Sequence, residues 1–82
     1  MVWVRTSGTS NISSAQANLA YTNLETGVLV QVLEYTSGSR TGECLIQLAG
    51  HSVVDELGTK YYPSLAEATA ALEGLIKGYT VL

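Results

Sequence analysis

The sequence VLVQVLEY at residues 28–35 and the sequence CLIQLA at residues 44–49 decide the fold of this chain. The polar stretch TSGSRTG at residues 36–42 separates them, and its two glycines are typical of a hairpin loop. Alternate side chains of a strand point to opposite faces, and here both sets are apolar: Val28, Val30 and Val32 on one face, Leu29, Leu33 and Tyr35 on the other. We therefore expect an antiparallel hairpin that is covered on both faces.

Residues 64–77 contain the clearest helical pattern. Ser64 and Glu67 form a capping box, in which each side chain can bind the other residue's free backbone N–H. Glu73 and Lys77 are spaced to pair on the exposed side, and Gly78 is placed to end the helix. The apolar side chains fall on one face at helical spacing, namely Leu65, Ala68, Leu72, Leu75 and Ile76.

The remaining segments predict shorter strands. Residues 2–5 read as a strand, residues 51–55 and 59–62 as a second hairpin, and residues 79–82 as a return to the edge of the sheet. Residues 13–23 fit two patterns: a helix capped by Ser13 or Ser14, or a strand in which Ala17, Leu19 and Tyr21 share one face. We favour the strand, because the Asn and Thr residues of this segment are poor helix formers.

The composition is that of one small globular domain, residues 1–82. Of the 82 residues, 46% are hydrophobic and 13% are charged, and the net charge is −3. Disordered chains combine low hydrophobicity with high net charge, so disorder is excluded. No segment gathers Lys or Arg, and the positive surface of a typical nucleic-acid-binding protein is therefore not expected.

The N-terminus and the cysteine count predict a cytoplasmic location. The first residues, MVWVR, lack the pattern of a signal peptide, and no apolar run approaches the roughly 20 residues of a membrane-spanning helix. Cys44 is the only cysteine, so a disulfide within the chain is impossible.

The residue types that perform catalysis or bind metals are sparse. His51 is the only histidine, and Asp55 lies four residues later, so the two share one face if residues 51–55 form a continuous strand. Cys44 opens an apolar strand beside Glu43, which favours a buried, unreactive thiol. One Cys and one His cannot form a structural zinc site. We predict no enzyme activity, no cofactor and no metal.

Three features are candidates for binding a partner. Arg40 lies in the glycine-containing hairpin loop, where it is the residue placed to bind a ligand. The Tyr61-Tyr62 pair belongs to a residue type that anchors protein interfaces. The small residues Ala66, Ala70 and Gly74 are spaced four apart along the helix, away from the apolar stripe, so that another backbone can approach closely.

Part of the C-terminal half resembles a family of nucleic-acid-binding domains. The sequence Leu57-Gly58-Thr59, then Tyr61, then SLAEA at residues 64–68 is similar to the strand-to-helix passage of AP2-like DNA-binding domains. Those domains, like the arm-binding domains of some integrases, set three strands against one helix. The closing order of three strands and a helix is also similar to that of double-stranded-RNA-binding domains.

The resemblance implies nucleic-acid binding through the sheet, with departures from the pattern of both families. AP2-like sheets read DNA with Arg and Trp, whereas these strands offer Gln31, Gln47 and Lys60. Helices of double-stranded-RNA-binding domains begin with a lysine cluster, and here Leu65, Ala66 and Glu67 stand at that position. This function is therefore our alternative, with Arg5, Arg40 and Lys60 as the contacting cations.

The sequence as a whole predicts an α+β domain that binds another protein. We expect an antiparallel meander of four or five strands with one C-terminal amphipathic helix on one face. The second apolar face then needs a cover, which is the N-terminal segment, a second copy or a partner. With so few charges, we expect a homodimer or an obligate complex. The predicted function is that of a regulator or inhibitor that occupies a partner's surface, and a Met-initiated chain this short suggests an accessory protein of a phage or mobile element.

Overall fold

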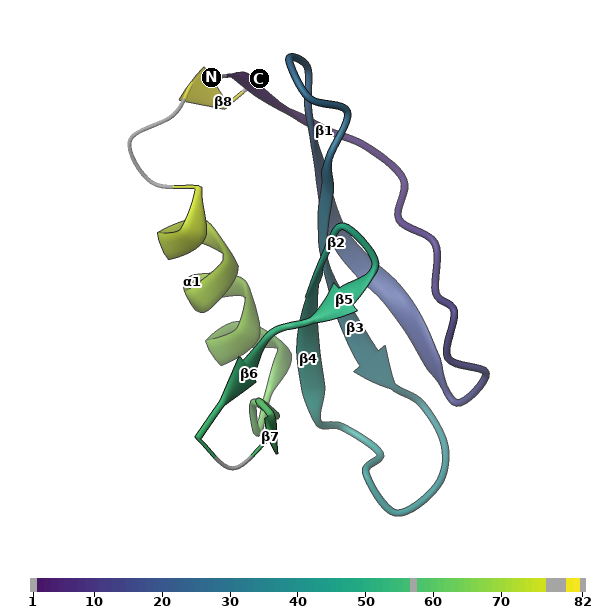
Figure 1. Ribbon diagram of the computed structural model, residues 1–82. Coiled ribbons are helices and arrows are strands. Elements are labelled where there is room, and N and C mark those ends of the chain that lie inside the picture. Colours follow the sequence, from purple (N-terminus) through teal and green to yellow (C-terminus); the bar gives the residue numbers. More distant parts are fainter. Residues whose placement is uncertain (1, 57, 77–79, 82) are drawn as a thin grey trace.

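The computed structural model describes residues 2–56, 58–76 and 80–81, and it confirms the α+β fold. One helix packs on one face of a six-stranded sheet (Figure 1). The strands lie in the order β5-β4-β3-β2-β1-β8, and β6 and β7 form a separate small hairpin. The elements are β1 (Val2–Arg5), β2 (Ala15–Asn23), β3 (Leu29–Tyr35), β4 (Cys44–Leu48), β5 (His51–Ser52), β6 (Val54–Asp55), β7 (Gly58–Thr59), α1 (Leu65–Leu75) and β8 (Thr80–Val81).

The predicted central hairpin is present as β3 and β4, and it is buried on both faces. Val32 lies opposite Ile46, and Leu33 lies opposite Leu45. Val32 and Ile46 belong to the core beneath the helix, whereas Leu33 and Leu45 belong to a second cluster. All four are at most 1% exposed. The apolar pattern on both faces of the hairpin therefore reflects two separate clusters, one on each side of the sheet.

Residues 15–23 form strand β2, which confirms the strand interpretation of this ambiguous segment. The pairing with β3 shifts between Ala17 and Leu19, so Asn18 is an extra residue in the ladder. Ala17 consequently packs with the second cluster, while Leu19 and Tyr21 pack with the core beneath the helix. The prediction that Ala17, Leu19 and Tyr21 share one face was wrong, because the bulge reverses the alternation.

Helix α1 begins at the predicted Ser64 cap, but among the described residues the Glu67 carboxylate makes no return hydrogen bond to the Ser64 N–H, and one leucine of the predicted stripe is not buried. The Ser64 hydroxyl accepts a hydrogen bond from the backbone N–H of Glu67, 3.2 Å away. Ala68, Leu72 and Ile76 are buried, but Leu75 is 50% exposed. The expected Glu73–Lys77 pair and the Gly78 cap lie outside the described residues.

Residues 51–62 form two short pieces in place of one regular hairpin. Strand β5 pairs with β4 of the large sheet. Strands β6 and β7 pair with each other as a separate small hairpin. Tyr62 then returns to β4, where its backbone exchanges hydrogen bonds with that of Cys44. At the opposite end of the sheet, β8 pairs in parallel with β1, which confirms the predicted return to an edge for Thr80 and Val81. Tyr79 and Leu82 lie outside the described residues.

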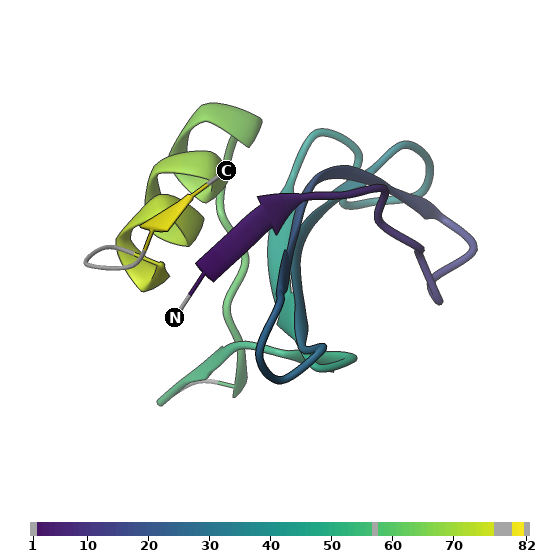
Figure 2. The same cartoon turned by 90° about the horizontal axis from the view of Figure 1, so that it is seen from above.

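Residues 6–14 cover the face of the sheet opposite the helix. Seen from above, this connector and α1 lie on opposite sides of the sheet (Figure 2). Gln31 is 3% exposed, and its side-chain amide accepts from the Thr9 N–H and donates to the Thr9 carbonyl and to Gln47. Gln47, equally buried, donates to the side-chain oxygen of Asn11. Of the three covers considered for this face, the N-terminal segment is therefore the one observed.

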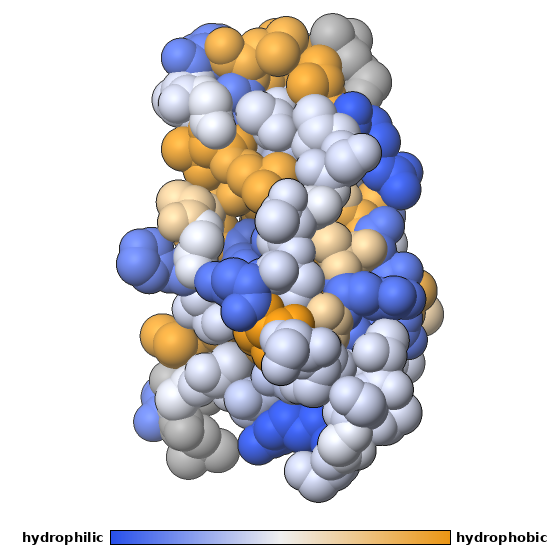
Figure 3. Space-filling view, turned by 90° about the vertical axis from the view of Figure 1, so that its right-hand side faces the viewer, coloured by the Kyte–Doolittle hydropathy of each residue, from blue (hydrophilic) through white to orange (hydrophobic). Residues whose placement is uncertain are grey.

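The outer surface on this side is mostly polar. Figure 3 looks onto it, and hydrophilic and weakly polar residues separate several small apolar patches. The buried amides of Gln31 and Gln47 are satisfied by the connector, so the backbone polar groups of that irregular segment are also partly paired. Within the described residues, the sheet thus has no large bare apolar face on this side.

Candidate functional site

The loop between β3 and β4, residues 36–43, is held in one shape by its own hydrogen bonds. The N–H of Gly42 donates to the Tyr35 carbonyl, and the Tyr35 N–H donates to Glu43, both at 2.9 Å. The Glu43 N–H donates to the Arg40 carbonyl at 2.8 Å. Gly38 and Gly42 have φ angles of 83° and 91°, a region that residues with a Cβ rarely adopt. These bonds and angles fix the position from which Arg40 leaves the backbone.

The Arg40 side chain lies on the ring of Tyr61. Its Cζ atom is 3.6 Å from the centre of that ring, and the Tyr61 ring is in turn 6.2 Å from the ring of Tyr35, tilted by 51°. Arg40 Nη1 also pairs with Glu43 Oε1 at 3.2 Å. The end of β3 and the hairpin loop that follows it thus meet the residues after β7, which lie much later in the sequence. We call Tyr35, Arg40 and Tyr61 the Tyr–Arg–Tyr cluster.

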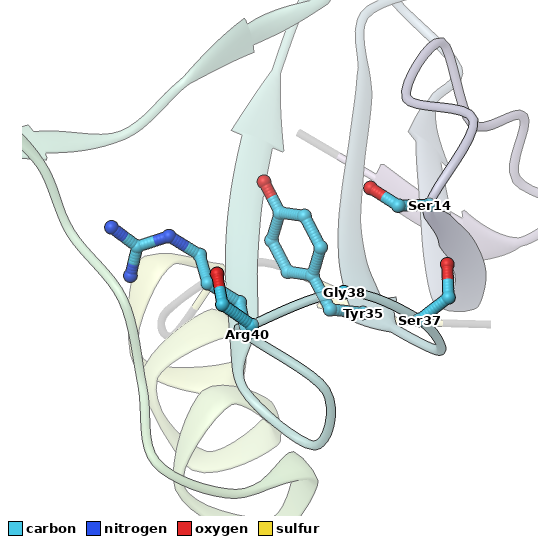
Figure 4. A pocket seen from close by; sticks show the side chains of 6 residues that line it. Ser14, Tyr35, Ser37, Gly38 and Arg40 are labelled. Atoms are coloured by element: carbon cyan, nitrogen blue, oxygen red, sulfur yellow. The ribbon is translucent and has the colours of Figure 1, made fainter.

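A pocket of about 230 Å³ lies beside this cluster. It is lined by Ser14, Tyr35, Ser37, Gly38, Ser39 and Arg40. Figure 4 shows the Tyr35 ring between two groups: Ser14 and Ser37 lie on one side, and the Arg40 side chain extends away on the other. The backbone N–H of Thr36 donates to the Ser14 carbonyl at 2.8 Å, which ties the connector to this end of the sheet. The pocket therefore offers serine hydroxyl groups to a ligand. The guanidinium of Arg40 lies on the other side of the Tyr35 ring.

The environment of Tyr35 raises the pKa of its hydroxyl group. Burial is the largest cause that raises the pKa of Tyr35, and the neighbouring Tyr61 raises it further. The positive charge of Arg40 lowers it, and Glu43 raises it. The pKa of Tyr35 therefore lies above the ordinary value of 10.0, so its hydroxyl remains a hydrogen-bond donor near neutral pH.

Of the predicted binding residues, the structure brings Arg40 and Tyr61 together and places the others elsewhere. Tyr62 packs against the core beneath the helix, and the Lys60 ammonium lies 5.5 Å from the centre of its ring. Ala66, Ala70 and Gly74 are exposed along α1, on another element from the hairpin loop. Their exposure agrees with the predicted ridge of small residues. No other described part of the chain covers this ridge.

Sequence reasoning missed Tyr35 and Ser14 as members of the site. Tyr35 was assigned to the apolar face of its strand, and it does pack against the second cluster. Its position as the last residue before the loop was the available signal, because a residue at the mouth of a loop contacts the loop's own side chains. Ser14 carried no such signal, since its approach depends on the path of the connector.

The candidates for chemistry are not brought together. His51 lies on β5 of the large sheet, whereas Asp55 lies on β6 of the small one. The continuous strand that would have placed them on one face is absent, because the chain changes partners at Val53. Cys44 is fully buried, and that burial raises the pKa of its thiol, to which the charge of Glu34 adds. Within the described residues, no three His, Cys, Asp or Glu side chains gather closely enough to hold a metal ion.

Of the residues expected to contact nucleic acid, the two glutamines are covered, whereas Arg5 and Arg40 are exposed. Gln31 and Gln47 lie beneath the connector, and Trp3 is 7% exposed in the core beneath the helix. Arg5 lies 5.9 Å from the centre of the Tyr21 ring, on β1. The sheet face that an AP2-like domain would present to DNA is therefore occupied by residues 6–14.

Comparison of the chain with protein-family models, with curated proteins and with solved structures finds no match. No helix in the described part of the chain has the length and apolar character needed to cross a membrane.

Proposed function

We propose that this protein is a small non-enzymatic binding module that acts as a regulator or inhibitor by occupying the surface of a partner protein. The observation that carries the proposal is the contact of 3.6 Å between Arg40 and the Tyr61 ring, beside Tyr35. Tyr and Arg are enriched among the residues that contribute most to protein–protein binding. The Tyr–Arg–Tyr cluster is the binding surface of the module, and a cytoplasmic location belongs to the same proposal.

The cluster is accessible and already ordered, which are two requirements of such a surface. The Arg40 side chain is 44% exposed, and both tyrosines are partly exposed. Because the loop bonds and the tyrosine ring already fix Arg40, little side-chain entropy remains to be lost on binding. The pocket of about 230 Å³ is smaller than the roughly 300–1,000 Å³ of typical small-molecule sites, which favours a single projecting side chain of a protein over a whole small ligand.

Self-association remains a second part of the proposal. The connector covers the far face of the sheet, so that face no longer requires a second copy. Support for a homodimer comes from the low charged fraction of 13% and from exposed aliphatic side chains, namely Leu24, Leu48, Val54 and Leu75. Light scattering coupled to gel filtration tests it: a dimer has twice the chain mass of 8.7 kDa, and a mass of 8.7 kDa at all concentrations rejects it.

Affinity capture with matched variants tests the binding surface. The wild type, Arg40→Ala, Tyr61→Ala and the control Arg5→Ala are each immobilised and exposed to lysate of the source cells, with and without nuclease treatment. Arg5 is a fair control because it also lies near a tyrosine ring but does not line the pocket. We expect one protein to be retained by wild type and Arg5→Ala, with or without nuclease, and lost with the two cluster variants.

The same experiment separates the alternative function. Retention that depends on nucleic acid disappears after nuclease treatment, and loss with Arg5→Ala as well as Arg40→Ala indicates a diffuse electrostatic contact. Either result would reject the Tyr–Arg–Tyr cluster as a protein-binding surface. The burial of Gln31 and Gln47 speaks against the alternative.

A further inference from the structure

We infer that the free edge of the Arg40 guanidinium binds a carboxylate group from an acidic segment of the partner protein. This inference rests on the proposed function and gives the partner its chemistry. The receptor consists of Arg40, held between Tyr61 and Glu43, with the hydroxyl-lined pocket alongside.

The guanidinium lies over the face of the Tyr61 ring. A distance of 3.6 Å from Cζ to the ring centre is too short for an N–H group to point into the ring, because the nitrogen would then stand between Cζ and the ring face. Stacking therefore covers one face of the planar cation and leaves its edges open. Arginine in this arrangement can make two parallel hydrogen bonds to one carboxylate.

Most of the donors of this guanidinium are unused. Arginine has five N–H donors, and among the described residues only one hydrogen bond, from Nη1 to Glu43 Oε1 at 3.2 Å, is made by the Arg40 side chain. The Nε and Nη2 atoms make no hydrogen bond within the described part of the chain. Glu43 thus contacts the guanidinium at Nη1, and the edge formed by Nε and Nη2 is left for a ligand.

The neighbouring carboxylate of Glu43 favours a singly charged ligand. Glu43 repels any anion at Arg40, and a phosphoryl group near neutral pH carries about twice the charge of a carboxylate, so it meets a larger repulsion. The pair between Arg40 and Glu43 is exposed and therefore contributes little to stability, so a ligand can shift Glu43 at small cost. The planar carboxylate also matches the planar edge of the guanidinium.

The pocket continues the receptor past Tyr35. Ser14, Ser37 and Ser39 line it, and none of their hydroxyl groups has a hydrogen-bond partner among the described residues. A peptide whose acidic side chain reaches Arg40 can pass over Tyr35 and present backbone carbonyls to these hydroxyls. The partner segment is therefore acidic at the position that meets Arg40.

A titration of ¹⁵N-labelled protein tests the inference. The probe is a short capped peptide of alternating Glu and Gly, and the control peptide has Gln in place of Glu. The readout is the Nε–Hε signal of Arg40, whose resonance responds to hydrogen bonding at that edge. We expect a saturable shift with the Glu peptide and none with the Gln peptide.

Three variants sharpen the test. Arg40→Gln abolishes the saturable shifts of the neighbouring amides, Arg40→Lys weakens binding by at least roughly tenfold because the fork is lost, and Glu43→Gln binds at least as tightly as wild type. Unchanged amide spectra of the free variants away from the loop show that they remain folded. Equal shifts with both peptides, binding retained by Arg40→Gln, or tighter binding of phenyl phosphate than of the Glu peptide overturns the inference.

The failure of this inference is distinguishable from the failure of the proposed function. If the Glu peptide gives no saturable shift while capture still depends on Arg40 and Tyr61, the binding module stands and its partner uses other chemistry. If the peptide binds as expected but no protein is captured through the cluster, carboxylate recognition stands and the proposed regulatory role fails.

Discussion

Gly8 is a residue at which a single methyl group does not fit. A Cβ atom built on Gly8 would lie 2.5 Å from Gln31 Oε1 and 2.7 Å from the Cβ of Ala17. Atoms that are not bonded to each other do not approach this closely in a packed interior. The absent side chain therefore lets the connector lie directly on β2 and β3, close enough for Thr9 to bind Gln31.

The substitution Gly8→Ala should destabilise the protein by about 1–3 kcal/mol, because the connector must move away from the sheet. The matched control is Gly74→Ala, since a Cβ at Gly74 meets nothing within 4 Å and the residue lies in a helix. That change should stabilise by about 0.5–1 kcal/mol. Urea unfolding measures both; equal effects of the two substitutions would contradict the close approach at Gly8.

At the scale of the element, the helix shows what spacing predicts and what it does not. The pattern placed Leu72 and Leu75 on one apolar stripe, and the structure buries Leu72 completely but leaves Leu75 half-exposed. Spacing defines which side of a helix is apolar, but the width of the sheet beneath decides how much of that side is covered. Strand β2 has a similar limit, because the bulge at Asn18 leaves no mark in the hydrophobic pattern.

The pair Leu72→Ala and Leu75→Ala tests this difference. Leu72→Ala removes a side chain from the core beneath the helix and should cost about 2–5 kcal/mol, because it leaves a cavity. Leu75→Ala should cost less than about 1 kcal/mol, since half of the side chain is already in water. Urea unfolding compares them, and a cost for Leu75→Ala near that of Leu72→Ala would show that a further contact covers Leu75.

At the scale of the whole molecule, β1, β4 and α1 contribute to one core. Trp3, Cys44 and Leu72 come from these elements and belong to the same cluster. We therefore expect one cooperative transition, with the same urea midpoint for Trp3 fluorescence, helical circular dichroism and the reactivity of Cys44 with a thiol reagent. Rapid labelling of Cys44 in the folded protein, or a separate midpoint for any probe, would contradict a single core.

The fold was more predictable than the site because the fold follows from patterns local in sequence, whereas the site depends on contacts between residues far apart in sequence. The hairpin, the Ser64 cap and the N-terminal strand follow from local pattern and turn chemistry, and all three are present. The meeting of Arg40 with Tyr61 depends on the return of the chain to β4 at Tyr62, which no local pattern encodes. Sequence reasoning could select both residues as candidates but could not place them in contact.

The parallel pairing of β1 with β8 determines where the molecule can be tethered. Val2 lies beside Thr80 and Trp3 beside Val81, so both ends of the chain leave from the same end of the molecule (Figure 1). The hairpin loop that carries Arg40 lies at the opposite end. A fluorescent label, a fusion protein or a solid support attached through either terminus therefore leaves the Tyr–Arg–Tyr cluster facing outward. A short linker that joins the two termini also permits a circular permutant with new termini in another loop.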